Sequence, residues 1–381
     1  MNTAEWDAVR SRIASLGRDP DATDIADALR WCGHLVSDSS VLAVASALHR
    51  DSVGAGPLEP LLALPGVTDV LVNGPEDVYV DTGDGLRTVP VCFDSDDDVR
   101  RLAVRLAASV GRRLDDASPF VDARMADGTR VHAILGSLAD VGTCLSLRIP
   151  ARSRLTLDDW VASGTCHPEL ADVLRRLVAA RVAFLVSGGT GSGKTTLLGS
   201  LLALVPPDER ILIVEDSREL DPDHPHCVRL EGRVANAEGA GAVTMTQLVR
   251  QALRMRPDRI VVGEVRGAEL VDLLIALNTG HEGGCGTVHA NAAETVPARL
   301  EALAALGGLG REAAHSQIAA AVQAVVHVAR DGVRRRVAGV AVLARGTDGF
   351  VETRRALDVS AEGRLLRHSA TDDLARVLGA R

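Results

Sequence analysis

The sequence is poor in lysine, in aromatic residues and in net positive charge. Lys194 is the only lysine among the 42 Lys and Arg residues, and Phe, Trp and Tyr make up 2% of the chain. Nucleobases would therefore find few aromatic side chains to stack on, and a formal net charge of −9 opposes a polyanion. These shortages argue against nucleic acid as the main partner.

The sequence also has no closely spaced cysteine pair and no long apolar run. Its six cysteines form no C-x-x-C motif, which indicates reduced cysteines in a cytosolic protein. No apolar stretch approaches the ~20 residues that a membrane-spanning helix needs, and the first residues do not read as a signal peptide. We therefore expect a cytoplasmic protein that reaches the inner face of the cytoplasmic membrane only through partners.

The length of 381 residues predicts two domains. Residues 1–52 carry helical spacing and read as a helical lead-in. Residues 53–149 contain short β-rich runs separated by Asn-Gly, Gly-Pro and Asp-Gly turn signals, which predicts a small α+β domain. We expect a linker at 150–155 and a second domain over 156–381.

In the second domain, buried-strand candidates at 182–187, 211–215 and 260–263 alternate with helical segments. Such alternation predicts a parallel sheet covered by helices on both faces, with ligands at the C-terminal ends of the strands. Capping patterns at Thr156 and Thr244 predict the starts of two helices. Apolar runs between 325 and 353 predict strands that extend the sheet.

The stretch 187–196 fits the phosphate-loop pattern G-x-x-x-x-G-K-[ST] without a gap. Its glycines would let backbone N–H groups converge on phosphate oxygens at a helix N-terminus. The alternative is a glycine-rich turn before an ordinary helix, but the order of strand, loop, Lys-Thr and helix favours a nucleotide. The predicted nucleotide contacts are Gly188, Gly189, Thr190, Gly191, Ser192, Gly193, Lys194, Thr195 and Thr196.

Within this loop, Lys194 would reach the β- and γ-phosphates, and the Thr195 hydroxyl would bind Mg²⁺. Acidic residues end two of the predicted strands, Glu215 and Asp216 after the first and Glu264 after the second. In a phosphate-loop sheet, acids at this edge hold Mg²⁺ through water or orient the attacking water. A solvated loop is the alternative for the pair at 215–216.

Arginines occur inside the β-rich runs 119–124, 129–134 and 144–149 of the first domain. A strand on a core offers one face to solvent, so these arginines either point outward or face a phosphate held by a neighbouring domain or subunit. An acidic run at 94–98 precedes a predicted helix at 99–110. Helix capping and the helix dipole explain this run better than metal binding does.

The stretch 281–291 contains two histidines, a cysteine and a glutamate between glycines. A zinc site is opposed by the spacing, because neither C-x-x-C nor H-E-x-x-H is present. The glycines instead predict a flexible loop with a nucleotide-sensing or interface role.

These stretches resemble the motifs of the secretion traffic ATPases. The segments 187–196, 215–216, 252–267 and 279–291 are similar to their Walker A, Asp box, Walker B and His box. The likeness is greatest to the CpaF-like (TadA, tight-adherence or Flp pilus) branch, which is related to type II and type IV secretion motors. In the first domain it runs through residues 56–62, 72–75, 111–115 and 118–124.

The resemblance implies a fold and an assembly. The expected fold is α/β, with a C-terminal RecA-like P-loop ATPase domain on a parallel-rich sheet and a smaller α+β, PAS-like N-terminal domain. The expected assembly is a homohexamer that hydrolyses ATP with Mg²⁺ between the domains and against a neighbouring subunit. Its partner would be a membrane platform protein of a pilus or secretion system.

The resemblance also implies residue roles. Glu215 is the favoured activator of water, and Glu264 would support Mg²⁺ with Thr195, partly through water, although the two acids could exchange roles. Arg130 and Arg148 match arginines that contact the terminal phosphate in relatives.

Further candidates for nucleotide contact are Arg124 and Arg266. His281 and His289 match the His box. Cys285 departs from the family pattern, since relatives often carry a hydroxyl or aliphatic residue there, and it predicts sensitivity to oxidation.

The predicted function is a cytoplasmic motor for Flp/Tad-type pilus assembly or protein secretion. A type IV secretion or conjugal transfer ATPase is the alternative from the same class. A nucleic-acid translocase is opposed by the acidic charge, although residues 334–336 form a small basic cluster, which reads as a solvated strand edge. A ring that uses ATP only for assembly is the remaining possibility.

Overall fold

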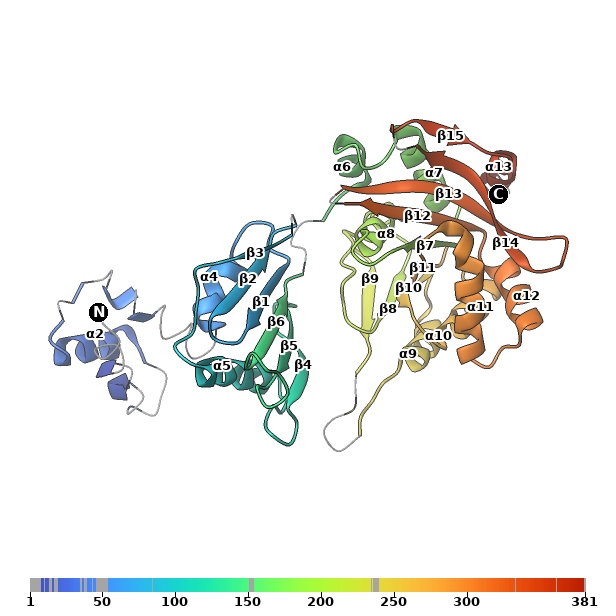
Figure 1. The fold of residues 1–381 in the computed structure, drawn as a ribbon. Helices are drawn as coiled ribbons and strands as arrows, with labels where there is room; N and C mark the ends of the chain where they lie inside the picture. Colours follow the sequence, from blue (N-terminus) through green and yellow to red (C-terminus); the bar gives the residue numbers. More distant parts are fainter. Residues whose placement is uncertain are drawn as a thin grey trace. The chain divides into compact units, whose positions relative to one another are not determined.

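The computed structural model describes residues 8–9, 11–13, 16, 20–34, 36–37, 40–42, 44–45, 54–83, 85–150, 154–233, 235, 240–332, 334–360 and 362–379. The chain divides into two compact units, Met1–Ala151 and Arg152–Arg381 (Figure 1). Each unit has its own hydrophobic core.

The described part of 1–52 contains a ten-residue helix, α2 (Ala22–Trp31). Asp21 caps it, because its side chain accepts from the N–H groups of Thr23 and Asp24 and the Asp24 side chain accepts from the Asp21 N–H. Apolar residues of α2 pack into a small core of their own with Val9 and Ile13. Residues 8–9, 11–13, 40–42 and 44–45 are also helical, and the other parts of the predicted helical lead-in that the ranges above omit lie outside the described residues.

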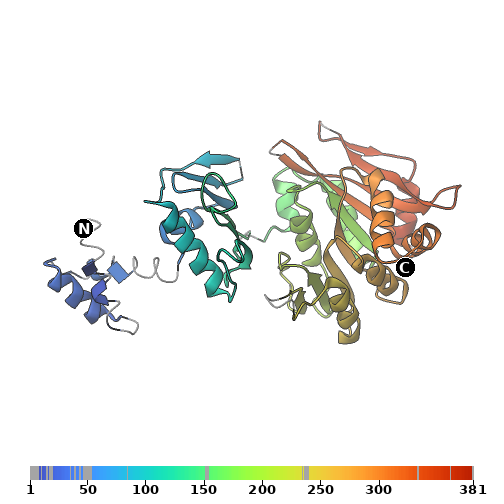
Figure 2. The same ribbon diagram turned by 60° about the horizontal axis from the view of Figure 1, so that its bottom comes forward.

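The rest of the first unit is an antiparallel sheet with a helix on one face. The sheet order is β3-β2-β1-β6-β5-β4, and every neighbouring pair is antiparallel. Figure 2 shows α5 (Asp96–Ser109) against this sheet. The elements before α5 are a short turn of helix (Gly56–Leu58), α4 (Glu59–Leu62), β1 (Asp69–Asn73), β2 (Asp77–Asp81) and β3 (Leu86–Thr88), and those after it are β4 (Phe120–Arg124), β5 (Arg130–Ile134) and β6 (Cys144–Arg148). The predicted α+β fold is thus confirmed.

The helix α5 begins three residues earlier than predicted, at Asp96. Asp96, Asp97 and Asp98 therefore lie in its first turn, where carboxylates complement the helix dipole. The Asp96 carboxylate also accepts from the backbone N–H and the hydroxyl of Thr143, which ties the helix to the loop before β6.

The second unit is built on one large mixed sheet, in the order β15-β14-β13-β12-β7-β11-β10-β8-β9. The neighbours from β12 to β9 pair in parallel, and β13, β14 and β15 add an antiparallel extension. The predicted parallel-rich α/β fold is confirmed. The strands are β7 (Phe184–Gly188), β8 (Ile211–Glu215), β9 (Cys227–Glu231), β10 (Arg259–Val265), β11 (Cys285–His289), β12 (Ala324–Asp331), β13 (Arg334–Arg345), β14 (Val351–Val359) and β15 (Leu365–Arg367).

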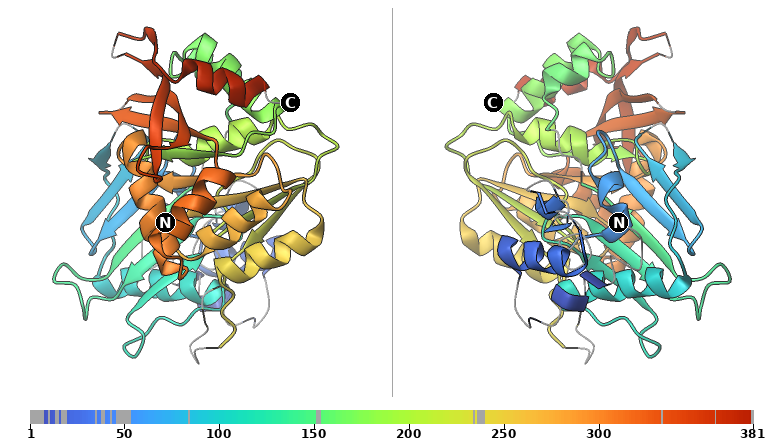
Figure 3. Two further views of the ribbon diagram at one scale, coloured as in Figure 1. Left: turned by 90° about the vertical axis from the view of Figure 1, so that its right-hand side faces the viewer. Right: turned by 90° about the vertical axis from the view of Figure 1, so that its left-hand side faces the viewer.

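Helices cover both faces of this sheet, because the strands alternate apolar side chains between two cores. Figure 3 shows α13 (dark red) on one side of the sheet and α11 and α12 (orange) on the other. One core receives α6 (Leu157–Ala162), α7 (Pro168–Ala179), α8 (Lys194–Leu202) and α13 (Thr371–Gly379), and the other receives α9 (Met245–Ala252), α10 (Glu269–Asn278), α11 (Val296–Leu306) and α12 (Arg311–Ala321).

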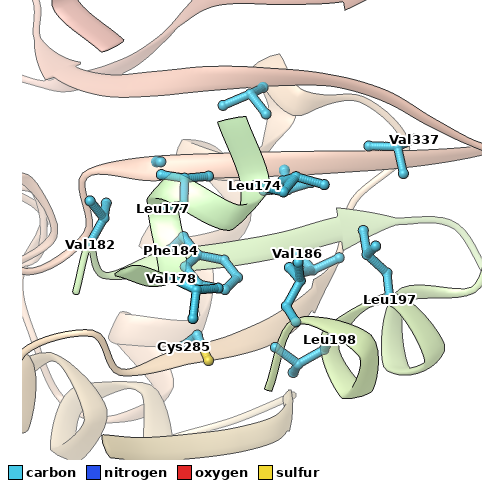
Figure 4. Packing of buried hydrophobic residues seen from close by; sticks show 14 of the residues in the cluster. Leu174, Leu177, Val178, Val182, Phe184, Val186, Leu197, Leu198, Cys285 and Val337 are labelled. Carbon is cyan, nitrogen blue, oxygen red and sulfur yellow. The ribbon is translucent and has the colours of Figure 1, made fainter. Parts of the chain in front are cut away.

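The core next to the phosphate loop is tightly filled. Val186 of β7 lies near Leu197 and Leu198 of α8, as Figure 4 shows, and Phe184 belongs to the same core; all four are 2% exposed or less. The start of α8 is therefore held rigidly on the strand that precedes it.

The prediction of a flexible loop at 281–291 is wrong for the middle of this stretch. Residues Cys285–His289 form β11, which lies between β7 and β10 in the middle of the sheet. A Cβ added at Gly286 would come within 2.6 Å of the Val262 carbonyl oxygen, so this glycine permits the close approach of two strands and does not mark a loop. Cys285 is 1% exposed and burial raises its pKa to about 12, which contradicts the expected sensitivity to oxidation.

No helix in the part of the chain that the structure describes is long and apolar enough to cross a membrane.

Candidate functional site

The phosphate loop connects β7 to α8 through residues 189–193. Gly193 is the N-cap of α8 and has a φ of 97°, a left-handed conformation that glycine adopts without strain. The Lys194 ammonium is buried in the loop and donates to the Gly189 carbonyl at 3.0 Å. Burial lowers the pKa of Lys194, an effect that the charge of Glu264 opposes. The Ser192 hydroxyl is buried and finds no hydrogen-bond partner among the residues described.

Glu215 ends β8 with a carboxylate that is only partly satisfied. Its Oε1 accepts from the backbone N–H groups of Glu219 and Leu220, both at 3.0 Å. Its Oε2 is buried and has no hydrogen-bond partner in the part of the chain that the structure describes, and the residue is 4% exposed. Burial raises the pKa of this carboxyl above its ordinary value. The solvated loop considered for Glu215 does not describe this side chain.

Glu264 lies on the neighbouring strand, because Val214 of β8 pairs with Val262 of β10. Unlike Glu215, it is already ion-paired. Arg266 donates to its Oε2 from Nε at 2.8 Å and also from Nη2. Arg266 additionally lies 3.9 Å from the Asp216 carboxylate.

The two histidines of the predicted His box are separated. His289, the last residue of β11, pairs with Gly188 and has its Nδ1 3.9 Å from Glu264 Oε1, so it borders the phosphate loop. His281 precedes β11, and its ring lies 3.3 Å from the Ala276 carbonyl near the end of α10. The structure therefore brings His289, but not His281, to the group of Lys194 and the acids.

An ion-pair network holds the loop that positions Glu215. Arg229 donates to the Leu220 carbonyl at 3.0 Å and pairs with Asp221 at 2.9 Å. Arg154 pairs with Asp221 at 2.7 Å and with Asp223 at 3.0 Å. These side chains line a cavity of about 460 Å³. Sequence reasoning missed both arginines, since no local pattern relates them to Glu215.

In the first unit, the predicted arginines form a row across the sheet. Arg130 of β5 lies opposite Arg124 of β4 and opposite Arg148 of β6, and Arg148 in turn lies opposite Asp69 of β1. The row is on the face away from the α5 core, since the alternate residues Val131 and Leu147 are buried in that core. We call Arg124, Arg130 and Arg148 the arginine row.

The arginine row is electrostatically costly, because like charges directly opposite one another destabilise a sheet. Within the described residues, the Arg148 side chain makes no hydrogen bond or ion pair, and the residue is exposed. Such a row is suited to bind an anion with dispersed charge.

A family model described as "Type II/IV secretion system protein" matches residues 51–362. The chain belongs to this family. The expected relation to secretion motors is thus confirmed at the level of the type II/IV secretion family.

Several curated relatives of this secretion family are similar over most of their length. A Mycobacterium tuberculosis protein, whose name assigns it to conjugal transfer, is 57% identical over 325 residues, which cover 84% of this chain and 92% of that protein. The type IV secretion system protein PtlH of Bordetella pertussis is 33% identical over 313 residues, covering 74% of this chain and 92% of PtlH.

Two solved structures share the fold of this type II/IV secretion protein. The pilus retraction motor PilT, with ADP bound, matches at a TM-score of 0.52 and 19% identity, covering 83% of each chain. The ATPase DotB of Yersinia pseudotuberculosis matches at a TM-score of 0.53 and 18% identity, covering 88% of this chain and 84% of DotB.

The described residues contain no group of three or more His, Cys, Asp or Glu side chains that could hold a metal ion on its own. Mg²⁺ that is bound to a nucleotide needs fewer protein ligands. Phosphate oxygens and water supply most of its ligands, and the protein adds one or two groups. The Thr195 hydroxyl and the Glu264 carboxylate fit that demand, and the unpartnered Ser192 hydroxyl fits a phosphate oxygen.

Proposed function

We propose that this protein is a Mg²⁺-dependent ATPase that drives a secretion or conjugal transfer machine. The observation that supports this most is the buried Oε2 of Glu215, which has no hydrogen-bond partner among the described residues and lies in the same sheet as a phosphate loop with a buried lysine. An unsatisfied buried carboxylate oxygen costs stability unless a ligand or water uses it. A buried carboxylate oxygen of this kind, at the end of a strand in the same sheet as the phosphate loop, is suited to hold an attacking water.

In this proposal, the phosphate loop binds the phosphates of ATP, and nearby side chains hold Mg²⁺. The loop N–H groups, the Lys194 ammonium and the Ser192 hydroxyl bind the phosphates of ATP. Mg²⁺, when bound, would offset the charge of the phosphates. Thr195 would hold it directly, and Glu264 directly or through water.

Glu215 is the proposed base, and the environments of the two acids decide this assignment. Its Oε2 is unpartnered and its pKa is raised by burial, so it accepts a proton from water more readily than an ordinary carboxylate. Glu264 is neutralised by Arg266. Arg266 and His289 are therefore the side chains nearest the Glu264 carboxylate, and both would have to move if Glu264 bound the metal ion directly.

We further propose that Arg130 and Arg148 contact the terminal phosphate of ATP bound to the same or a neighbouring subunit, with Arg124 beside them. Guanidinium groups stabilise the charge that develops on the transferred phosphoryl group. Because each subunit would contribute to a shared site, a homohexameric ring is the proposed assembly. His281 is proposed to act at such a shared site and not beside Lys194.

Two candidate machines have specific support. Relatives named for conjugal transfer or type IV secretion support a motor of that class. The motif resemblance to the CpaF-like branch supports a motor for Flp/Tad pilus assembly. In either case the ring would work at the inner face of the cytoplasmic membrane through a platform protein. Deleting the gene in its host separates them, because loss of surface pili and loss of DNA transfer are different phenotypes.

Purified protein tests the activity itself. Wild type is expected to release phosphate from ATP with Mg²⁺, and Lys194→Ala to lose both nucleotide binding and turnover. Glu215→Gln is expected to bind ATP normally and to turn over at least about 100-fold more slowly, as expected for loss of a general base. Persistent turnover in Glu215→Gln would remove the base assignment, and a folded wild type without affinity for ATP would refute the function.

A further inference from the structure

The β12–β13 hairpin lies on the side of the phosphate loop away from the acids. In the sheet, β7 has β11 on one side and β12 on the other, and the strands of Glu264 and Glu215 follow beyond β11. Val328 of β12 pairs with Gly188, so the residues that end β12 run alongside the loop. The loop is therefore flanked by carboxylates on one side and by the hairpin on the other.

Two arginines of the hairpin contact the loop. A Cβ added at Gly191 would lie 3.1 Å from Nη1 of Arg330, and one at Gly193 would lie 3.6 Å from Cδ of Arg335. Both arginines are exposed. Their side chains thus lie against the loop while remaining accessible to a ligand.

The charges of the hairpin are not balanced internally. Arg330 and Arg335 lie directly opposite each other in the β12–β13 ladder, which is unfavourable for like charges. Asp331 pairs with Arg336 at 2.8 Å and not with either of them. The Arg330 Nε donates to the Gly332 carbonyl, and the side chain of Arg335 makes no hydrogen bond or ion pair within the described residues.

The position of these arginines fits the nucleoside end of a bound nucleotide. Its terminal phosphate must point toward Glu215 and Glu264, which places the ribose and base on the hairpin side of the loop. The aromatic residues of the second unit are not available to stack on a base. Trp160 and Phe184 are 4% and 2% exposed, and Phe350 already packs against His315 and Arg311.

We propose that Arg330 and Arg335 form the nucleoside subsite of the ATP site, with the planar guanidinium of Arg335 stacked on the base. A guanidinium stacks on aromatic faces and replaces the aromatic side chain that the composition does not supply. Arg330 lies nearer the loop and contacts the ribose and α-phosphate. This inference rests on the proposed ATPase function but adds a surface that the nucleotide motifs do not include.

Calorimetric binding of ADP and of inorganic tripolyphosphate to the full chain tests the subsite. Arg335→Ala is expected to weaken ADP binding about tenfold, a typical effect of losing one stacked base, while tripolyphosphate binding stays unchanged. Arg335→Lys is expected to be as weak as Arg335→Ala, because an ammonium keeps the charge and loses the planar group. Arg334→Ala, on the same exposed hairpin, is the matched control and should bind both ligands as wild type does.

Three outcomes would overturn the subsite. They are unchanged ADP binding by Arg335→Ala, an equal loss for ADP and tripolyphosphate, and full rescue by Arg335→Lys. In each of these the wild type still binds nucleotide, so the proposed ATPase survives. A wild type that binds neither ligand would instead refute the ATPase function. Thermal unfolding of each variant confirms that the exposed substitutions leave the fold intact.

Discussion

At the scale of single residues, the environment of Glu215 predicts a pH dependence. Burial raises the pKa of this carboxyl above its ordinary value of 4.5, and the charge of Arg229 lowers it. A general base works as the carboxylate, so turnover should rise with pH through a pKa above 4.5. Arg229→Ala removes a lowering influence and should move this acidic limb to higher pH. The measurement is kcat against pH.

The matched control for that prediction is Arg299→Ala, an exposed arginine on α11. Its acidic limb should coincide with that of wild type. If Arg229→Ala lowered the rate equally at every pH, Arg229 would support the loop without influencing the titration of Glu215.

The cysteines provide a second prediction at this scale. Cys166 and Cys285 are buried and burial raises the pKa of each to about 12, whereas Cys92 is exposed. Since the thiolate is the reactive form, an alkylating reagent should modify Cys92 rapidly and should reach Cys166 and Cys285 only after unfolding. Mass spectrometry of labelled peptides measures this, with Cys92→Ser as control. Rapid native labelling at Cys285 would contradict the buried central strand.

At the scale of secondary-structure elements, local chemistry predicted some boundaries accurately. The capping patterns at Thr156 and Thr244 both form complete capping boxes, on α6 and α9. The apolar run at 211–215 is a fully buried strand with the predicted bounds. The sequence of such a segment is enough to predict its structure. In a capping box a side chain accepts a hydrogen bond from a nearby backbone N–H, and in a buried strand every residue is apolar.

These caps make a measurable prediction. Thr156→Ala and Thr244→Ala should each lower the free energy of unfolding by about 0.5–2 kcal/mol, because the backbone N–H of Asp159 or of Gln247 loses the threonine hydroxyl that accepts from it. Urea denaturation of the purified chain measures the loss. Thr295 is the matched control, since it occupies the N-cap of α11 without a side-chain bond to the helix. An equal loss in Thr295→Ala would argue against capping as the cause.

Other elements could not be predicted from local signals. The segment 285–289 reads as a loop by its glycines, yet it is a strand because β7 and β10 pair with it from both sides. Strand propensity depends on such neighbours more than on the segment.

The candidate site likewise has a part that local sequence predicts and a part that it does not. Spacing predicted the phosphate loop and the acids, but the contact of Arg335 with Gly193 joins residues far apart in the chain, and only the sheet order creates it.

At the scale of the whole molecule, opposite charges are distributed between the two units. The second unit carries Lys194 and the acids, and the first carries the arginine row, whose members lie opposite one another across the sheet. An anion would offset the repulsion between these like charges, so we expect the first unit to act on a nucleotide that the second unit of the same or a neighbouring subunit binds.

This division predicts separate effects on binding and on turnover. Arg148→Ala should lower kcat by about 100-fold or more, the effect of removing one group that stabilises transition-state charge, and should leave ADP affinity unchanged, because ADP lacks the terminal phosphate. Arg87→Ala, an exposed arginine on β3 outside the row, should change neither value. Mixing Arg148→Ala with Lys194→Ala subunits should restore turnover where the row serves a neighbouring subunit, since each variant supplies the part that the other lacks. A parallel loss of ADP affinity in Arg148→Ala would instead give the row a role in ground-state binding.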